Sequence, residues 1–171
     1  MKQPVLKSML LGTLLATAGL VEAAEPGVYV GGGIGTASTN QSGYDNAGSY
    51  KLFVGAQAEG FGLELGYVDL GRFKQKGNSS NSYTVDGPQL NVIGELFISR
   101  GVYGYGNFGF YNWDLNDTLA TNNDSGTSVT LGLGIKVLMG KNLAVRGGWD
   151  RYQNISDSNV DMLSLNGMYQ F

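Results

Sequence analysis

The sequence predicts an all-β protein, an eight-stranded antiparallel up-and-down transmembrane β-barrel. From residue 27 onward, segments of about ten residues alternate apolar with small or polar side chains, which is the period of a strand. The connections between these segments alternate between short and long. Only 15% of the residues are charged, yet no later segment reaches the ~18 apolar residues of a membrane-spanning helix. A barrel explains how a chain so poor in charge can cross a membrane.

The N-terminus has the features of a secretory signal peptide. Two lysines in the first seven residues precede an apolar core over residues 9–21, and Val-Glu-Ala at 21–23 has the pattern of a cleavage site. We therefore expect a signal peptide at residues 1–23 and the barrel domain at residues 24–171. Export of this kind makes the outer membrane the expected location.

Eight segments fit the strand pattern, and they span residues 27–37, 48–58, 61–71, 84–98, 102–113, 127–138, 142–153 and 161–171. Tight turns of two or three residues join the second segment to the third, the fourth to the fifth and the sixth to the seventh. Polar loops make the other four connections, at residues 38–47, 72–83, 114–126 and 154–160. Short turns at one end and long loops at the other are typical of a membrane barrel.

Within each segment the apolar side chains share one face. In the third segment, Leu63, Leu65 and Tyr67 alternate with Glu64 and Gly66. The fourth, sixth and eighth segments repeat this division, with Leu90, Val92, Leu96 and Ile98, then Val129, Leu131, Leu133, Ile135 and Val137, then Leu163, Leu165, Tyr169 and Phe171 on the apolar face. Aromatic residues near strand ends, which suit the lipid headgroup region, are Tyr50, Tyr67, Phe108, Phe110, Trp149, Tyr169 and Phe171.

Alternation alone also fits a secreted, lipocalin-like binder of small molecules, which would hold its apolar face inside. The opposite face carries few charges among many small polar residues, which is sparse for a surface in water. Its three cations and three anions cancel, as the interior of a low-dielectric barrel requires. These six residues are Lys51, Glu64, Glu95, Lys136, Arg146 and Asp150. The membrane barrel is therefore the prediction, and the lipocalin-like binder is the alternative.

The composition excludes several activities. The chain contains no His and no Cys, so it has no Ser-His-Asp or Cys-His triad, no His proton shuttle and no thiolate nucleophile. A carboxylate pair remains chemically possible, but Glu64 and Glu95 are expected to point into a filled lumen. We therefore expect no enzyme activity, no metal site and no cofactor. The formal charge of -3 argues against nucleic acid as a partner.

Three stretches resemble the transmembrane domain of the OmpA family, namely residues 62–72 (GLELGYVDLGR), 144–149 (AVRGGW) and 163–171 (LSLNGMYQF). The resemblance covers the expected barrel but not the periplasmic domain that follows the barrel in OmpA itself. In the last stretch, the alternate residues Tyr169 and Phe171 resemble the signal that the outer-membrane assembly machinery recognises. The resemblance therefore implies assembly into the outer membrane, with this machinery as a partner.

The same resemblance implies an internal ion-pair gate, with Glu64 at the acidic position of the third strand and Arg146 at the basic position of the seventh. The sequence departs from the family at two further gate positions, where it has Ile93 and Lys136. We expect Glu64 to pair with Arg146, with Lys136 as its alternative partner. Glu95, Lys51 and Asp150 are expected to complete a neutral network.

An eight-stranded barrel has an interior just wide enough for side chains to fill. A lumen plugged by this network would have at most the activity of a small pore. A narrow ion-conducting porin is therefore kept as an alternative function.

The long loops are the other candidate site, because function in a rigid barrel concentrates there. Loop 72–83 contains Arg72, Lys74 and Lys76 and no acidic residue, which suits contact with lipopolysaccharide phosphates. Tyr44, in loop 38–47, and Phe73, in loop 72–83, are expected to be exposed for contact with a host surface or a phage.

The acidic loop 114–126 contains Asp114, Asp117 and Asp124, which suit divalent cations or the basic loop. Taken together, the sequence predicts a monomeric, non-enzymatic outer-membrane protein that supports the envelope and makes surface contacts. Its long loops are expected outside the cell and its termini in the periplasm.

Overall fold

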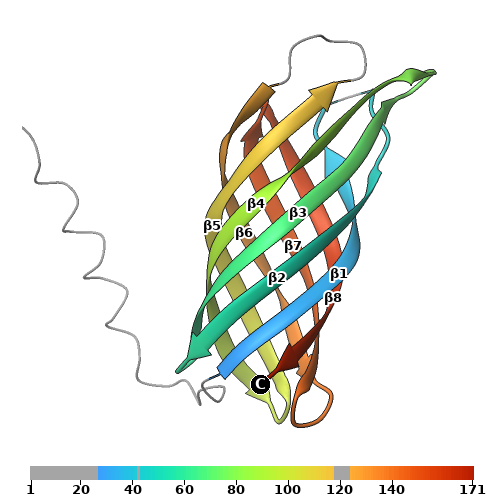
Figure 1. Cartoon of the computed structure of the whole chain (residues 1–171). Helices are drawn as coiled ribbons and strands as arrows, with labels where there is room; N and C mark the ends of the chain where they lie inside the picture. Colours follow the sequence, from blue (N-terminus) through green and yellow to red (C-terminus); the bar gives the residue numbers. More distant parts are fainter. Residues whose placement is uncertain (1–26, 42, 118–123) are drawn as a thin grey trace, which may run out of the picture.

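The computed structural model describes residues 27–41, 43–117 and 124–171, which form a closed barrel of eight antiparallel strands (Figure 1). The predicted fold class is thereby confirmed. The expected signal peptide at residues 1–23 lies outside the described residues. Among the residues that are described, no helix is long and apolar enough to span a membrane. The strands are β1 (Gly27–Thr39), β2 (Ala47–Ala58), β3 (Phe61–Gln75), β4 (Asn78–Ser99), β5 (Val102–Asp117), β6 (Asp124–Leu138), β7 (Leu143–Ile155) and β8 (Ser158–Gln170).

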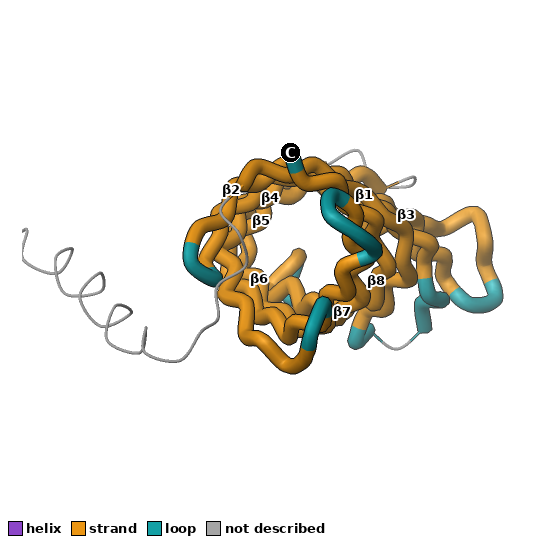
Figure 2. Tube along the Cα trace, turned by 90° about the horizontal axis from the view of Figure 1, so that it is seen from below, coloured by secondary structure: helices purple, strands orange, loops and turns teal. Residues whose placement is uncertain are grey.

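The barrel closes with a stagger that tilts its strands. The ladder of paired residues that leaves β1 at Tyr29 runs through Glu64 on β3 and returns to β1 at Thr39, ten residues further along. Seen along its axis, the barrel is a closed ring (Figure 2). Its strands therefore have no open edge, which is what a strand structure in lipid requires.

Alternation places apolar side chains on the outer face. On β3, Leu63 and Leu65 are 59% and 60% exposed, whereas Glu64 between them is 4% exposed. The outward residues predicted on β4, β6 and β8 are exposed in the same way, with Val129 half-buried. Of the aromatic residues predicted for the headgroup region, all are exposed except Trp149, which is half-buried. The outer surface is thus a continuous apolar band with aromatic residues toward its margins.

The two ends of the barrel differ less in connection length than predicted, because the strands run further and two of the four loop-end connections have only two residues. The turn end carries the connections 59–60, 100–101 and 139–142. The loop end carries the connections 40–46, 76–77, 118–123 and 156–157, of which Ser42 and residues 118–123 lie outside the described residues. The predicted loop 72–83 is instead a hairpin of β3 and β4, which projects at the top of Figure 1.

A β-bulge at Gly71 changes which side chains of β3 face the lumen. The pairing of β3 with β4 shifts register at this residue, and Gly71 has a φ of 86°, which favours glycine. A Cβ atom there would lie 2.0 Å from the carbonyl oxygen of Gly48. Beyond the bulge Phe73 is fully buried and Arg72 is exposed. The prediction that Phe73 is exposed is therefore wrong, because the bulge inverts the alternation.

The interior is apolar toward the loop end. The buried residues that form this apolar cap are Ala37, Ala47, Val68, Leu70, Phe73, Val85, Tyr111, Trp113, Tyr152, Ile155, Val160 and Met162. On β7, Arg146 and Asp150 precede Tyr152 and Ile155, so the charged residues lie on the turn-end side of the apolar cap. Near the turn end, Tyr29, Phe53, Ala144 and Met168 form a second, smaller buried cluster.

Candidate functional site

Glu64 and Arg146 form an ion pair across the lumen. β3 and β7 are opposite one another in the ring, and Arg146 Nη2 lies 2.7 Å from Glu64 Oε2. The Tyr29 hydroxyl donates a hydrogen bond to the same carboxylate oxygen at 3.2 Å. The guanidinium carbon lies 4.6 Å from the ring centroid of Phe53 and 5.0 Å from that of Tyr105. The structure thus pairs the two residues that side-chain parity and the family resemblance selected.

Lys136 pairs with Glu95 on β4, not with Glu64 as the alternative expectation had it. Lys136 and Arg146 are cross-strand neighbours on β6 and β7. The two cations therefore lie side by side, and each has an acid of its own from the opposite half of the ring. The Lys136 ammonium also lies 5.1 Å from the ring centroid of Tyr103.

Lys51 and Asp150 form the third pair, with Nζ 2.8 Å from Oδ2. Asn107 donates a hydrogen bond to the other carboxylate oxygen of Asp150 at 2.8 Å. The cross-strand neighbour of Asp150 is Gly132, where a Cβ atom would lie 2.2 Å from Asp150 Oδ1. Glycine at this position therefore leaves the space that the carboxylate occupies.

Together the six charged residues form a neutral, buried ion-pair network. Each is at most 6% exposed. Each pair keeps its two ions compensated, which matters because an unpaired charge in a low-dielectric interior is very unfavourable. Toward the apolar cap, the side chains of Gln89, Asn91 and Thr130 continue the polar interior through mutual hydrogen bonds of 3.0–3.3 Å.

Sequence reasoning missed the aromatic surroundings of the network and the apolar cap. Tyr29, Phe53 and Tyr105 occupy inward positions of their strands. They were missed because the sequence analysis assigned apolar residues to the outer face. The structure accommodates the Tyr105 ring beside Gly148, where a Cβ atom would lie 1.9 Å from the Tyr105 hydroxyl. The Gly-rich inward face was therefore the available signal, since small residues on one strand leave room for a ring from another.

The basic residues predicted for a loop lie on the β3–β4 hairpin. Arg72 and Lys74 follow the bulge on the outer face of β3, and Lys76 lies in the two-residue turn. All three side chains are exposed. They form what we call the basic hairpin, which extends past the apolar band on the outside of the barrel.

Acidic side chains lie next to the basic hairpin. Asp69, Asp86 and Asp114 are successive cross-strand neighbours on β3, β4 and β5. The Tyr67 hydroxyl donates a hydrogen bond to Asp86. Within the described residues, no three His, Cys, Asp or Glu side chains gather as metal ligands would. Asp124 is exposed at the start of β6, and the Asp117 side chain is not among those described.

The chain end predicted as an assembly signal completes the barrel wall. Tyr169 and Phe171 are both exposed on the outer face, and their ring centroids are 5.1 Å apart. The Phe171 backbone N–H donates to the carbonyl of Val28 at 2.9 Å, and the Gln170 N–H donates to Asn142 at 2.7 Å. The last residues are therefore held by β1 on one side and by the connection between β6 and β7 on the other.

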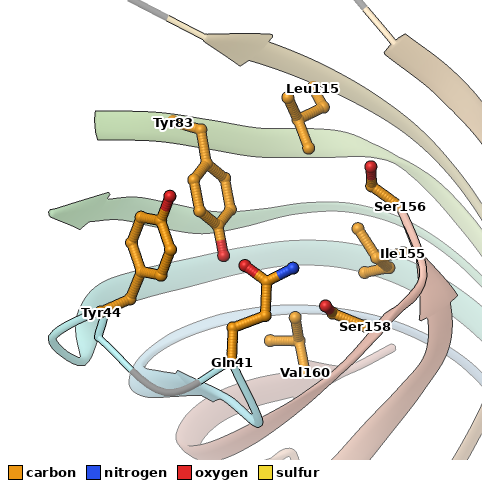
Figure 3. Close-up of a pocket in the computed structure, with 8 residues that line it drawn as sticks. All are labelled: Gln41, Tyr44, Tyr83, Leu115, Ile155, Ser156, Ser158 and Val160. Carbon is orange, nitrogen blue, oxygen red and sulfur yellow. The ribbon is translucent and has the colours of Figure 1, made fainter. Parts of the chain in front are cut away.

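A pocket of about 160 Å³ opens above the apolar cap at the loop end (Figure 3). Tyr44 and Tyr83 meet edge to face with ring centroids 5.1 Å apart, and Tyr83 stacks on Phe73 at the same separation. We call this cavity the mouth pocket, and its lining is formed by Gln41, Tyr44, Tyr83, Leu115, Ile155, Ser156, Ser158 and Val160.

The chain matches the model of a known protein family. The model of the family described as outer membrane protein beta-barrel domain matches residues 8–171. No curated protein sequence matches the chain. The match covers every strand of the barrel.

Several solved structures share the fold. Neisserial surface protein A has 16% sequence identity and a TM-score of 0.68, and the alignment covers 84% of this chain and 97% of that one. OprG from Pseudomonas aeruginosa has 13% identity and a TM-score of 0.67, with 89% and 99% covered. Ail of Yersinia pestis, solved in complex with the heparin analogue sucrose octasulfate, has 16% identity and a TM-score of 0.65, with 86% and 100% covered. At these identities the similarity concerns the fold.

Proposed function

Because this chain belongs to the outer membrane protein beta-barrel domain family, we propose that it is a non-enzymatic outer-membrane protein that supports the envelope and makes surface contacts at its loop end. The observation that carries this proposal is that buried side chains occupy the lumen along its length. They run from the small cluster near the turn end, through three ion pairs, to the apolar cap. An interior occupied in this way leaves the loop end as the surface for partners.

In this proposal the barrel is a monomer with its loop end outside the cell and both termini in the periplasm. The support is that the two longest connections, 40–46 and 118–123, are both at the loop end, since membrane barrels carry short turns on the periplasmic side and longer connections outside. A contact with a host surface or a phage would use the same loop end.

A narrow ion-conducting pore is the second candidate. It is favoured by buried polar atoms that have no hydrogen-bond partner among the described residues, namely Ser49 Oγ, Asn107 Oδ1, Ser128 Oγ and Asn166 Oδ1. Buried groups of this kind usually bind ordered water. The apolar cap lies between Asn107 and Asn166 and the loop end, whereas Ser128 is the cross-strand neighbour of Tyr111 within the cap. Apolar constrictions oppose the passage of hydrated ions.

Conductance in planar bilayers distinguishes the two candidates. For the wild-type chain we expect no discrete current steps. The double variant Tyr111→Ala/Tyr152→Ala thins the apolar cap, because these rings are fully buried and their centroids are 5.0 Å apart, and it should then conduct. The control Phe108→Ala/Phe110→Ala removes two outward rings and should stay silent. Regular current steps from the wild-type chain would support the pore instead.

The surface contact is proposed to include lipopolysaccharide phosphates bound by the basic hairpin. Arg72 and Lys74 are exposed on the outer face of β3, a short distance along the strand from the outward Tyr67. Tyrosines on such a surface lie at the headgroup level, so these cations reach the zone where phosphates lie. Arg and Lys bind phosphate through charge-assisted hydrogen bonds.

Neutralising the basic hairpin should weaken binding to lipopolysaccharide without affecting folding. We expect Arg72→Gln/Lys74→Gln to lose on the order of 2 kcal/mol of binding free energy, at ~1 kcal/mol per cation near an anionic surface. Adding Lys76→Gln should weaken binding further. The measurement is the affinity of the detergent-purified chain for lipid A with and without its phosphates.

The turn-end variant Arg100→Gln/Lys141→Gln removes the same charge from exposed positions and serves as the control. It should bind as the wild-type chain does. Unchanged affinity in the hairpin variants, or equal loss in the control, would contradict phosphate contact by these residues.

A further inference from the structure

We propose that the mouth pocket binds one neutral pyranose ring, a sugar unit of a glycan. That such a glycan lies outside the cell rests on the proposed function, whereas the binding itself does not. The pocket brings together four parts of the chain: the β1–β2 connection, β4, β5 and the β7–β8 hairpin. Its floor is apolar and its wall carries polar groups, which is the arrangement that suits a sugar ring.

The floor and one side of the pocket are apolar. Ile155 and Val160 are 3% and 1% exposed and belong to the apolar cap. Tyr44, Tyr83 and Leu115 pack against the same cluster. A pyranose ring presents C–H groups on its faces, and these can lie against aromatic and aliphatic side chains as other apolar groups do.

Polar groups lie beside these apolar side chains. Figure 3 shows the Gln41 carboxamide and the Tyr83 hydroxyl pointing toward one another in the pocket. Ser158, which is 6% exposed, and Ser156 add hydroxyl groups from the β7–β8 hairpin. Amide and hydroxyl groups both donate and accept hydrogen bonds, so they match the hydroxyl groups around a sugar ring.

The chemistry of the lining selects a neutral ligand with several polar groups. None of the eight lining residues is charged, so a phosphate or a carboxylate would find no counter-ion in the pocket. A purely apolar ring would displace water from the exposed Gln41 and the buried Ser158 without replacing its hydrogen bonds, which is unfavourable, most of all for the buried Ser158. A sugar ring satisfies both parts of the lining.

The volume limits the ligand to one ring. A cavity of about 150 Å³ accommodates benzene, and the mouth pocket measures about 160 Å³. We therefore expect a single terminal sugar unit to enter, with the rest of the glycan outside.

Hydrogen bonds hold the walls in place without a ligand. The Asn40 N–H donates to the carbonyl of Asn159, and the Asn159 N–H donates to Asn40 Oδ1, each at 3.1 Å. The N–H of Asp45 donates to the carbonyl of Lys74 at 2.9 Å. These bonds tie the β1–β2 connection to β8 on one side and to the basic hairpin on the other. Binding therefore requires little ordering of the protein, which favours affinity for a small ligand.

Saturation-transfer NMR tests the proposal on the full chain in phosphocholine micelles, because sugar-based detergents would compete. The probes are methyl α-D-glucopyranoside, methyl α-D-galactopyranoside and, as a ring of similar size with one hydroxyl, cyclohexanol. We expect at least one glycoside to bind saturably, with a Kd on the order of millimolar. Gln41→Leu should weaken this binding by about fivefold or more, as expected for the loss of a hydrogen bond.

The control Gln153→Leu makes the same chemical change on β7, outside the pocket, and should leave the glycoside Kd unchanged. Heat-modifiable migration in electrophoresis verifies that each variant is folded. No saturable glycoside binding by the wild-type chain would overturn the proposal, as would equal weakening by Gln153→Leu. Cyclohexanol binding tighter than both glycosides and unaffected by Gln41→Leu would also overturn it, because the pocket would then select an apolar ring. None of these outcomes bears on the phosphate contact of the basic hairpin, which is measured separately.

Discussion

Arg146 is held by one carboxylate and two aromatic rings, and this environment fixes how the residue can be changed. Its Nε and Nη1 atoms have no hydrogen-bond partner among the described residues. The rings of Phe53 and Tyr105 lie against the guanidinium instead. Aromatic faces attract a desolvated cation but do not replace a counter-ion. Glu64 is therefore the group that compensates the buried charge of Arg146 inside the barrel.

Replacing Glu64 by Ala should destabilise the barrel strongly. The change leaves Arg146 buried without its counter-ion, which costs on the order of 3–5 kcal/mol if the pair is dry and less if water reaches it. Arg146→Ala in the same chain should recover part of the loss, because the uncompensated charge is then gone. The measurement is the free energy of unfolding by urea in lipid vesicles, for the two single variants and the double variant.

The pairing of Lys136 with Glu95 supplies a control for this cycle. Lys136→Ala combined with Glu64→Ala should show weaker coupling than Arg146→Ala combined with Glu64→Ala, although Lys136 is the cross-strand neighbour of Arg146. Additive losses in the Glu64–Arg146 cycle would show that the two residues do not interact.

At the scale of elements, β8 is the strand whose placement closes the barrel. It pairs with β7 on one side and with β1 on the other, from Tyr29 opposite Gln170 to Thr39 opposite Val160. Every other pairing joins strands that are consecutive in the chain. The contact between β1 and β8 therefore forms only when the whole chain is in place, and it depends on the last residues being held in register.

Deleting Phe171 should impair assembly. Its side chain is 74% exposed on the outer face, and its backbone N–H is bonded to Val28. The deletion removes an aromatic anchor and the terminal feature proposed for the assembly machinery. We expect slower insertion and degradation in the periplasm, measured as the fraction of heat-modifiable barrel in outer-membrane preparations.

Phe171→Trp keeps an aromatic ring at the end of the chain and should assemble as the wild-type chain does. Normal amounts of folded barrel after deletion of Phe171 would show that the terminal residue is not needed for recognition.

At the scale of the whole molecule, the two ends of the barrel define the orientation that we propose. The chain has no Cys, so a single introduced thiol reports one position. Reagents that do not cross the membrane should label Ser80→Cys near the tip of the basic hairpin in intact cells, and should not label Lys141→Cys at the turn end. Asn123→Cys, in the β5–β6 connection outside the described residues, should be labelled as well. Labelling of Lys141→Cys alone would reverse the orientation.

The sequence by itself determined the number of strands and the side of the wall that most of their residues face. Alternation along a strand is a local property, so Leu63 and Glu64 could be assigned to opposite faces before any partner strand was known. The same reasoning placed all six charged residues inside. Phe73 was expected in an exposed loop, but β3 continues past it, and the bulge at Gly71 turns its side chain inward. That bulge depends on the pairing of β3 with β4 and on the nearby carbonyl of Gly48, which no single strand reveals.

Only the tertiary structure decided which charges pair and what surrounds them. Parity left Glu64 with two possible cations, and the stagger of the closed ring brought it to Arg146 while it brought Lys136 to Glu95. The apolar cap and the mouth pocket depend on the same closure, since their residues come from strands that are distant in the sequence. The physical reason is that side chains alternate between the two faces within each strand, which needs no partner strand. The stagger, which sets the height of each residue in the lumen, is fixed only when β8 pairs with β1.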